Sequence, residues 1–174
     1  DGTANQVLKT DGSGALGWTT VSGGASAIDG LSDAKLEGPN FTGSMLLGHQ
    51  TTGTLNNADY NVGVGLGALD AITSGDYNTS IGYNSLSSNT TGSYNTANGN
   101  LALHSNTEGD FNTATGVRAL YSNTTGINNT ANGYNALALN TSGGYNTANG
   151  MYASAYNTTG VYNTANGYYA LLSN

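Results

Sequence analysis

The residues most often used in catalysis and metal binding are few in this 174-residue sequence, and they stand far apart. It contains two histidines, His49 and His104, and no cysteine. A zinc site brings three or four such ligands together at characteristic spacings, and no acidic cluster accompanies either histidine. We therefore interpret both histidines as solvated surface residues, and we expect neither a metal site nor a cofactor.

Acidic residues offer equally little for catalysis. Asp70, Asp76, Glu108 and Asp110 could stack on neighbouring units of a 17-residue repeat, but only Asp76 and Asp110 share a repeat position, and Ser93 occupies that position between them. A calcium site needs six to eight oxygen ligands, so we expect these side chains to cap turns instead. The sequence has no Ser/His/Asp arrangement, phosphate-binding loop or catalytic carboxylate pair, and we expect no catalytic residues and no enzymatic activity.

A regular series of hydroxyl and amide side chains is the first candidate binding surface. The triplet Thr-Ala-Asn or Thr-Ala-Thr occurs five times at intervals of 17 residues. In a strand, its outer two residues share one face. This array consists of Thr96, Asn98, Thr113, Thr115, Thr130, Asn132, Thr147, Asn149, Thr164 and Asn166. It is similar to the flat threonine-rich arrays of ice-binding surfaces, although any stacked repeat produces ladders of like residues.

Aromatic residues near the C-terminal end form the second candidate surface. Tyr152, Tyr156, Tyr168 and Tyr169 enrich this region. Because flat aromatic faces suit sugar rings, these four are candidate contacts with a glycan receptor. Tyrosine also packs well between stacked repeats, so a purely structural role stays open.

Charge and hydropathy exclude two classes of partner. The formal net charge is −7, and the basic residues are only Lys9, Lys35 and Arg118. No basic patch can therefore neutralise phosphates, and we expect no nucleic-acid binding. No stretch approaches the roughly 18 apolar residues of a membrane span, so we expect no membrane insertion.

The dominant feature of the sequence is a period of 17 residues. We number each repeat from the residue before its Asn, so that Tyr60, Tyr77 and Tyr94 stand at position 1. Position 6 is then always glycine: Gly48, Gly65, Gly82, Gly99, Gly116, Gly133, Gly150 and Gly167. A second glycine stands at position 16 in six repeats: Gly75, Gly92, Gly109, Gly126, Gly143 and Gly160.

A period this short predicts an all-β fold, a β-solenoid or β-roll of 17-residue coils, because helical repeats and propeller blades are about 33 residues or longer. We expect two short strands in each coil, joined at corners where both glycine series adopt positive φ. Small residues at positions 4 and 9 and Leu at position 10 should fill the interior. Position 1 tyrosines should stack as a continuous ladder.

The regular pattern does not cover the whole chain. We assign residues 43–174 to the solenoid, with a capping coil at 43–59 followed by seven repeats, the last incomplete. Residues 1–42 form an N-terminal element: a β-hairpin over 5–21 around Asp11 and Gly12, then a connector with at most a short helix near 28–36. Because the sequence begins with Asp1, we expect it to be a segment of a longer chain.

The predicted interior is thin, and this favours association. Each coil buries mainly alanine and one leucine, which barely offsets the ordering cost of about 1–2 kcal/mol per residue. We therefore expect an oligomer, most plausibly a homotrimer. Position 5 changes from Val64 and Ile81 to mostly asparagine further on, and this face could line the trimer axis or meet solvent.

The repeat also resembles a known family. Strings of the type NTAxGxxALxSNTTG resemble bacteriophage tail-fibre shafts, and their alanine and glycine rhythm is similar to the head repeats of trimeric autotransporter adhesins. The segment 44–79 is similar to fibre-like structural proteins of marine cyanophages, and GTANQVLKTDGSGALGW resembles the connector before such shafts.

This resemblance implies a stiff homotrimeric shaft that presents or forms part of a host-receptor-binding region. The location would be a virion tail fibre, outside the cell, and the partners would be two further copies of the chain and a host cell-surface glycan or protein. Two alternatives stay open: the head of an adhesin on a bacterial cell surface, and an ice-binding solenoid that uses the Thr-x-Asn array.

Overall fold

The computed structural model describes residues 6–10, 16–20, 34–38, 41–47 and 56–173. The chain packs as two compact units, Asp1–Ser32 and Asp33–Asn174. The division falls before the boundary expected at residue 42, because β3 pairs with β4 and β4 pairs with the first strand of the repeats.

The first unit contains two antiparallel strands. Strand β1 (Gln6–Thr10) pairs with β2 (Leu16–Thr20) in a register that sets Gln6 opposite Thr20. The expected turn at Asp11 and Gly12 lies outside the described residues.

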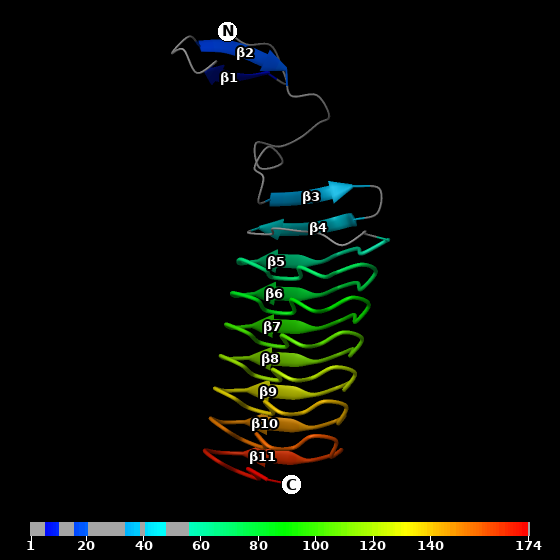
Figure 1. Ribbon diagram of the computed structural model, residues 1–174, viewed down its shortest axis with the longest axis vertical. Coiled ribbons are helices and arrows are strands. Elements are labelled where there is room, and N and C mark those ends of the chain that lie inside the picture. The colour runs from blue at the N-terminus through cyan, green and yellow to red at the C-terminus, as the bar shows by residue number, and fades with distance from the viewer. Residues whose placement is uncertain (1–5, 11–15, 21–33, 39–40, 48–55, 174) are drawn as a thin grey trace. The chain divides into compact units, whose positions relative to one another are not determined.

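The second unit is a parallel β-solenoid that begins with an antiparallel pair, β3 (Ala34–Gly38) and β4 (Phe41–Leu47). Strand β4 then pairs in parallel with the first of seven stacked strands (Figure 1). These strands are β5 (Val62–Val64), β6 (Thr79–Ile81), β7 (Thr96–Asn98), β8 (Thr113–Thr115), β9 (Thr130–Asn132), β10 (Thr147–Asn149) and β11 (Thr164–Asn166). The all-β class and the solenoid of 17-residue coils are confirmed.

The connector was expected to contain at most a short helix near 28–36. Within that range Ala34, Lys35 and Leu36 are not helical, because they belong to β3 and pair with β4. The rest of that range, 28–33, lies outside the described residues.

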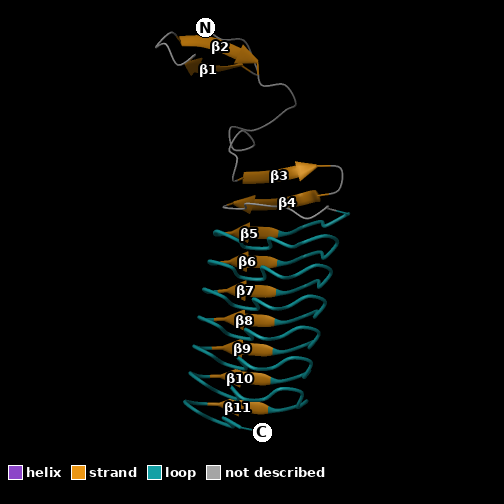
Figure 2. Ribbon diagram, in the orientation of Figure 1, coloured by secondary structure: helices purple, strands orange, loops and turns teal. Residues whose placement is uncertain are grey.

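Each coil contains one strand and not the two that we expected (Figure 2). The strand covers positions 3–5 and pairs in register, so that Thr96 lies beside Thr113. The opposite leg cannot be extended, because its residues at positions 8 and 10 have positive φ, 58° at Leu101 and 51° at Leu103. It is nevertheless bonded from coil to coil: the Leu103 amide donates to the Ala119 carbonyl at 3.0 Å.

The position 6 glycines form the corner after each strand. Gly65, Gly82, Gly99, Gly116, Gly133, Gly150 and Gly167 have φ between 121° and 148°, whereas Gly48 lies outside the described residues. The neighbouring coil also leaves no room for a side chain at this position. A Cβ on Gly99 would lie 2.5 Å from the Gly116 carbonyl oxygen in the next coil.

The position 16 glycines have a different role from the one we expected. None of them is in the left-handed region, so the expectation of positive φ was wrong for this series. A Cβ on Gly109 would lie 2.5 Å from the Gly126 carbonyl oxygen and would also overlap the Asn106 side chain. These positions are glycine because the neighbouring coil and a buried asparagine leave no room.

The predicted apolar interior is confirmed. Ala97 at position 4, Ala102 at position 9 and Leu103 at position 10 are fully buried and belong to one continuous core. In the coil where serines replace both alanines, Ser80 and Ser85 hydrogen-bond to each other across the interior. The strand and the opposite leg therefore face each other over a layer that is one side chain thick.

Two buried asparagine ladders, which we did not expect, complete the core. At position 2, Asn112 Nδ2 donates to Asn95 Oδ1 at 3.2 Å and to the Gly126 carbonyl at 2.8 Å. At position 13, Asn123 Nδ2 donates to Asn106 Oδ1 at 2.8 Å and to the same Gly126 carbonyl at 3.0 Å. Both ladders thus converge on the carbonyl of the position 16 glycine.

Candidate functional site

The Thr-x-Asn array lies on the outer face of strands β7–β11. Thr96 and Asn98 are exposed on either side of the buried Ala97, and the in-register pairing repeats this pattern along the stack. Some of its side chains bond to one another: Asn132 Nδ2 donates to Asn149 Oδ1 at 2.8 Å. The array is therefore a regular surface of hydroxyl and amide groups, exposed on β7 and β11 and in part only half-exposed on the strands between them.

The N-terminal part of the same face is apolar. Met45 and Leu47 on β4 and Val62 and Val64 on β5 are partly exposed there, and Ile81 on β6 is 43% exposed. At position 3 threonine replaces the apolar residue from Thr79 on β6 onward, and at position 5 asparagine or threonine replaces it from β7 onward. We name these five residues the apolar strand patch.

The position 1 aromatic residues stack along one edge of the solenoid. The ring centroids of Tyr60, Tyr77, Tyr94 and Phe111 follow one another at 4.8–4.9 Å with nearly parallel planes. Asn128 interrupts this ladder, and Tyr145 and Tyr162 resume it at 5.0 Å. Stacking is confirmed, but the ladder is interrupted and not continuous. Burial and neighbouring rings raise the pKa of Tyr77.

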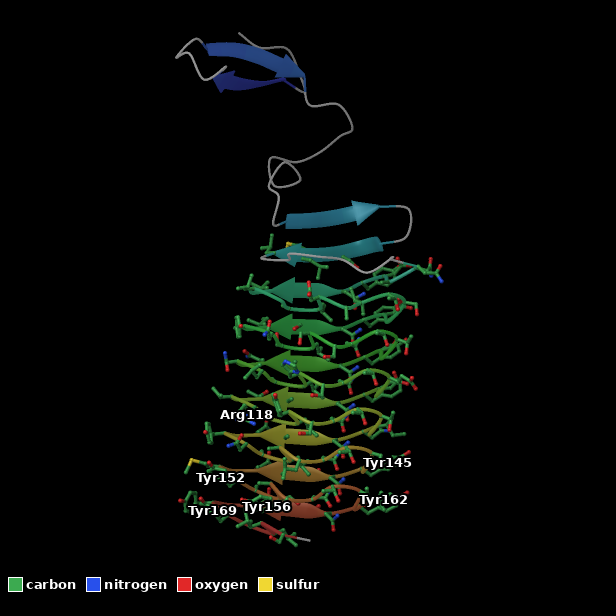
Figure 3. All side chains as sticks on the ribbon, viewed as in Figure 1. Arg118, Tyr145, Tyr152, Tyr156, Tyr162 and Tyr169 are labelled. Carbon is green, nitrogen blue, oxygen red and sulfur yellow. The ribbon has the colours of Figure 1, made fainter. Side chains whose placement is uncertain are left out.

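The candidate receptor tyrosines lie away from this ladder. Figure 3 shows Tyr152 and Tyr169, with Arg118, at the opposite edge of the stack from Tyr145 and Tyr162. Tyr152 stacks on Tyr169 at 5.0 Å, and Tyr168 meets Tyr169 edge to face at 4.4 Å. Hydrogen bonding between Tyr168 and Tyr169 adds to partial burial in raising the pKa of Tyr169, with burial the larger cause.

Two of these four tyrosines, Tyr152 and Tyr156, border a hollow of about 170 Å³. It lies on the leg opposite the strands and spans three coils. We name it the C-terminal hollow; its lining consists of Arg118, Asn135, Ala138, Leu139, Tyr152, Ala155 and Tyr156. Tyr168 and Tyr169 are not part of it.

The sequence contains the signal for this hollow, although we did not recognise it. Position 11 is His104 and then Tyr121 in two successive coils, and it becomes Ala138 and Ala155 in the next two. The loss of these rings opens space above the two alanines. Over the same coils position 12 changes from Ser122 to the larger Leu139 and Tyr156, which border the hollow on one side.

Arg118 gives the hollow its charge. Its guanidinium lies over the Tyr121 ring, 4.4 Å from the centroid, and among the described residues no carboxylate or carbonyl bonds to its side chain. From residue 111 to residue 174 the sequence contains no other charged residue. The cation is therefore held in place by a ring while its hydrogen-bond donors stay available.

Asn135 also borders the hollow. Its side-chain oxygen is buried in the solenoid and has no hydrogen-bond partner. Buried polar atoms without a partner are rare in folded proteins, and each calls for an explanation. The hollow therefore combines an unpaired cation, an asparagine side chain and two tyrosines.

The histidines and acidic residues differ in part from what we expected. His104 is not a solvated surface residue: its Nδ1 is buried without a partner, its ring lies against Tyr121 at 5.2 Å, and burial lowers its pKa. His49 lies outside the described residues. Asp76 and Asp110 cap turns as expected, since each accepts a backbone hydrogen bond of 2.7 Å from the preceding coil.

Within the described ranges, no three histidine or acidic residues gather as metal ligands, and no helix there has the length and apolarity to cross a membrane. Comparisons with models of protein families, with curated proteins and with solved structures gave no match. The interpretation of this chain therefore rests on its own sequence and geometry.

Proposed function

We propose that this protein is structural: a segment of a stiff homotrimeric shaft in a virion tail fibre that presents or forms part of a receptor-binding region. The observation that carries the proposal is the constancy of the coil. The same asparagine hydrogen bonds recur from the coil of Asn61 to that of Asn163. A structure that repeats one bonding pattern without variation suits a rod, whose length follows the number of coils.

The proposed assembly in threes rests on the apolar strand patch and on the thin core. A single coil buries little apolar surface, and further burial between chains would add stability at about 25 cal/mol per Å². The apolar strand patch is partly exposed in the single chain, whereas the cores of interfaces bury such surface. We propose that this patch packs around the trimer axis and that the Thr-x-Asn array continues along it.

The net charge of −7 fits this role. Chains with a large net charge repel one another and stay soluble, which suits fibres that must not aggregate sideways. An adhesin head on a bacterial cell surface has the same architecture and is the alternative location.

Molar mass in solution, measured by light scattering during size exclusion, tests the assembly. We expect about three times the 17.5 kDa of one chain. Ile81→Asp should dissociate the trimer, because it buries three carboxylates close together at the axis. Ser142→Asp is the matched control, since it lies on an exposed turn at the position where Glu108 is tolerated in another coil. A monomeric parent protein would contradict the trimeric shaft.

Ice binding is the second candidate function, and the exposed, in-register Thr-x-Asn array is the observation in its favour. The two candidates make opposite demands on this face, because ice binding needs it open and a trimer would cover it. A monomer that inhibits ice recrystallisation, and loses this activity in Thr130→Tyr, would replace the shaft proposal.

A further inference from the structure

We propose that the C-terminal hollow binds an acidic sugar: a pyranose ring that carries a carboxylate, as found in the glycans of cell surfaces. The proposal deepens the attachment role and depends on it for its biological meaning. The binding chemistry itself follows from the residues around the hollow.

The size of the hollow limits the ligand to about one ring. Pockets for drug-sized molecules hold about 300–1,000 Å³, whereas this one holds about 170 Å³. Its floor is made by Ala138 and Ala155, which are 7% and 3% exposed. The hollow therefore fits one monosaccharide unit, with space for the rest of a glycan outside it.

The walls suit the apolar faces of a sugar ring. Tyr152, Tyr156 and Leu139 border the hollow, and Tyr156 is 53% exposed. A tyrosine has an apolar ring for the carbon-bound hydrogens of a sugar and a hydroxyl for its oxygens. Tyr152 is already held in place, because it stacks on Tyr169 in the next coil.

Arg118 selects a carboxylate. Its planar guanidinium offers paired donors that match the two oxygens of a carboxylate. The contact with Tyr121 favours one placement of the exposed guanidinium before the ligand arrives, so that less conformational freedom is lost on binding. No carboxylate of the protein competes for it within the last four coils, since Arg118 is their only charged residue.

Asn135 completes the set of contacts. It occupies position 8 in the coil between those of Arg118 and Tyr152 and borders the hollow. Because its side-chain oxygen is buried, the amide nitrogen is the group that can donate to a sugar oxygen. In order along the stack, a carboxylate would then meet Arg118, a hydroxyl would meet Asn135, and the ring would lie toward Tyr152 and Tyr156.

This site and the proposed trimer contact occupy different sides of the coil. The apolar strand patch belongs to β4–β6, whereas the lining of the hollow comes from positions 8, 11 and 12 of the opposite leg. Assembly through the strands would therefore leave the hollow open.

Ligand-observed NMR on the full chain tests the proposal with three probes: the methyl glycosides of glucuronate, N-acetylneuraminate and glucose. We expect at least one acidic glycoside to bind about tenfold more tightly than the neutral glucoside, and Arg118→Gln to remove this preference. If neither acidic probe binds at about 10 mM, or if the acidic and neutral probes bind alike, the proposal is wrong.

Two variants separate loss of the site from loss of the fold. Ala138→Tyr should abolish binding by filling the hollow, and it should fold because Tyr121 occupies the same position one coil earlier. Tyr162→Ala is the matched control: this residue is 74% exposed at the opposite edge, and its loss should leave binding unchanged. Binding that survives in Ala138→Tyr would overturn the proposal.

Molar mass measured on the same samples keeps the two proposals apart. A monomer that binds the acidic probe retains the sugar site and rejects the trimeric shaft. A trimer that binds none of the probes supports the shaft and rejects the sugar site.

Discussion

At the scale of single residues, buried asparagines distinguish this solenoid from one with a purely apolar core. Asn112 is fully buried, and its Oδ1 accepts bonds from the backbone and the side-chain nitrogen of Asn129 at 3.0 and 3.1 Å. Burying an amide is unfavourable unless its donors and acceptors are paired. Here each asparagine forms hydrogen bonds with the asparagines of the coils above and below. The amides are therefore paired only if successive coils all carry asparagine at this position.

We predict that Asn112→Ala destabilises the fold by roughly 3 kcal/mol or more, because each buried partner left unpaired costs about 1–3 kcal/mol. Asn100→Ala makes the same change at an exposed position outside the strand face, where other coils carry Tyr83 or Val117, and should alter stability by about 0.5 kcal/mol or less. Urea denaturation followed by circular dichroism compares the two. If both variants lowered the free energy of unfolding equally, the buried asparagine ladder would not stabilise the fold more than an exposed asparagine does.

Backbone conformation explains the main failure of the sequence-based expectations. Glycine at position 6 indicates a corner, and the structure has positive φ there. Leucine does not favour positive φ, because the left-handed conformation costs residues other than glycine about 1–2 kcal/mol of free energy each. Leu86, Leu103, Leu120 and Leu137 nevertheless have φ of 47–51°. Packing and hydrogen bonds between coils impose this geometry, and no local pattern predicts it.

At the scale of the coil, the period, the strand and the small interior residues could all be predicted, because each follows from spacing and alternation. The hollow could not be recognised, since it results from replacements in successive coils that matter only once the coils are stacked. Tyr121 and Ala138 are neighbours in space although 17 residues separate them. Departures from a repeat are therefore as informative as the repeat itself.

Ser154 is one such departure in the core. It occupies the leucine position between Leu137 and Leu171, it is 1% exposed, and its hydroxyl has no partner. We predict that Ser154→Leu stabilises the fold by about 1–3 kcal/mol, through apolar burial and removal of an unpaired hydroxyl. The backbone accepts leucine there, since φ is 48° at Ser154 and 50° at Leu137.

Ser122→Leu is the control for this change, because it adds the same side chain at a half-buried place where Leu139 stands one coil later. It should shift the urea midpoint little. A lower midpoint for Ser154→Leu would show that the interior of this coil is narrower than that of its neighbours.

At the scale of the whole solenoid, the central claim is that every coil is an interchangeable step. Stacked ring centroids about one strand spacing apart, 4.8 Å for Tyr60 and Tyr77, measure this step directly. Because the bonding pattern is the same at each step, removing whole coils should rejoin matching positions. Removing any other length would shift asparagines and glycines out of register.

The most direct test is small-angle X-ray scattering of the protein and of a variant that lacks the three coils 94–144. The deletion joins position 17 at Ser93 to position 1 at Tyr145. We predict an unchanged cross-section and a particle shorter by about 14 Å, at roughly 4.8 Å per coil. An altered cross-section, an unchanged length or a loss of folded structure would contradict the account of a rod built coil by coil.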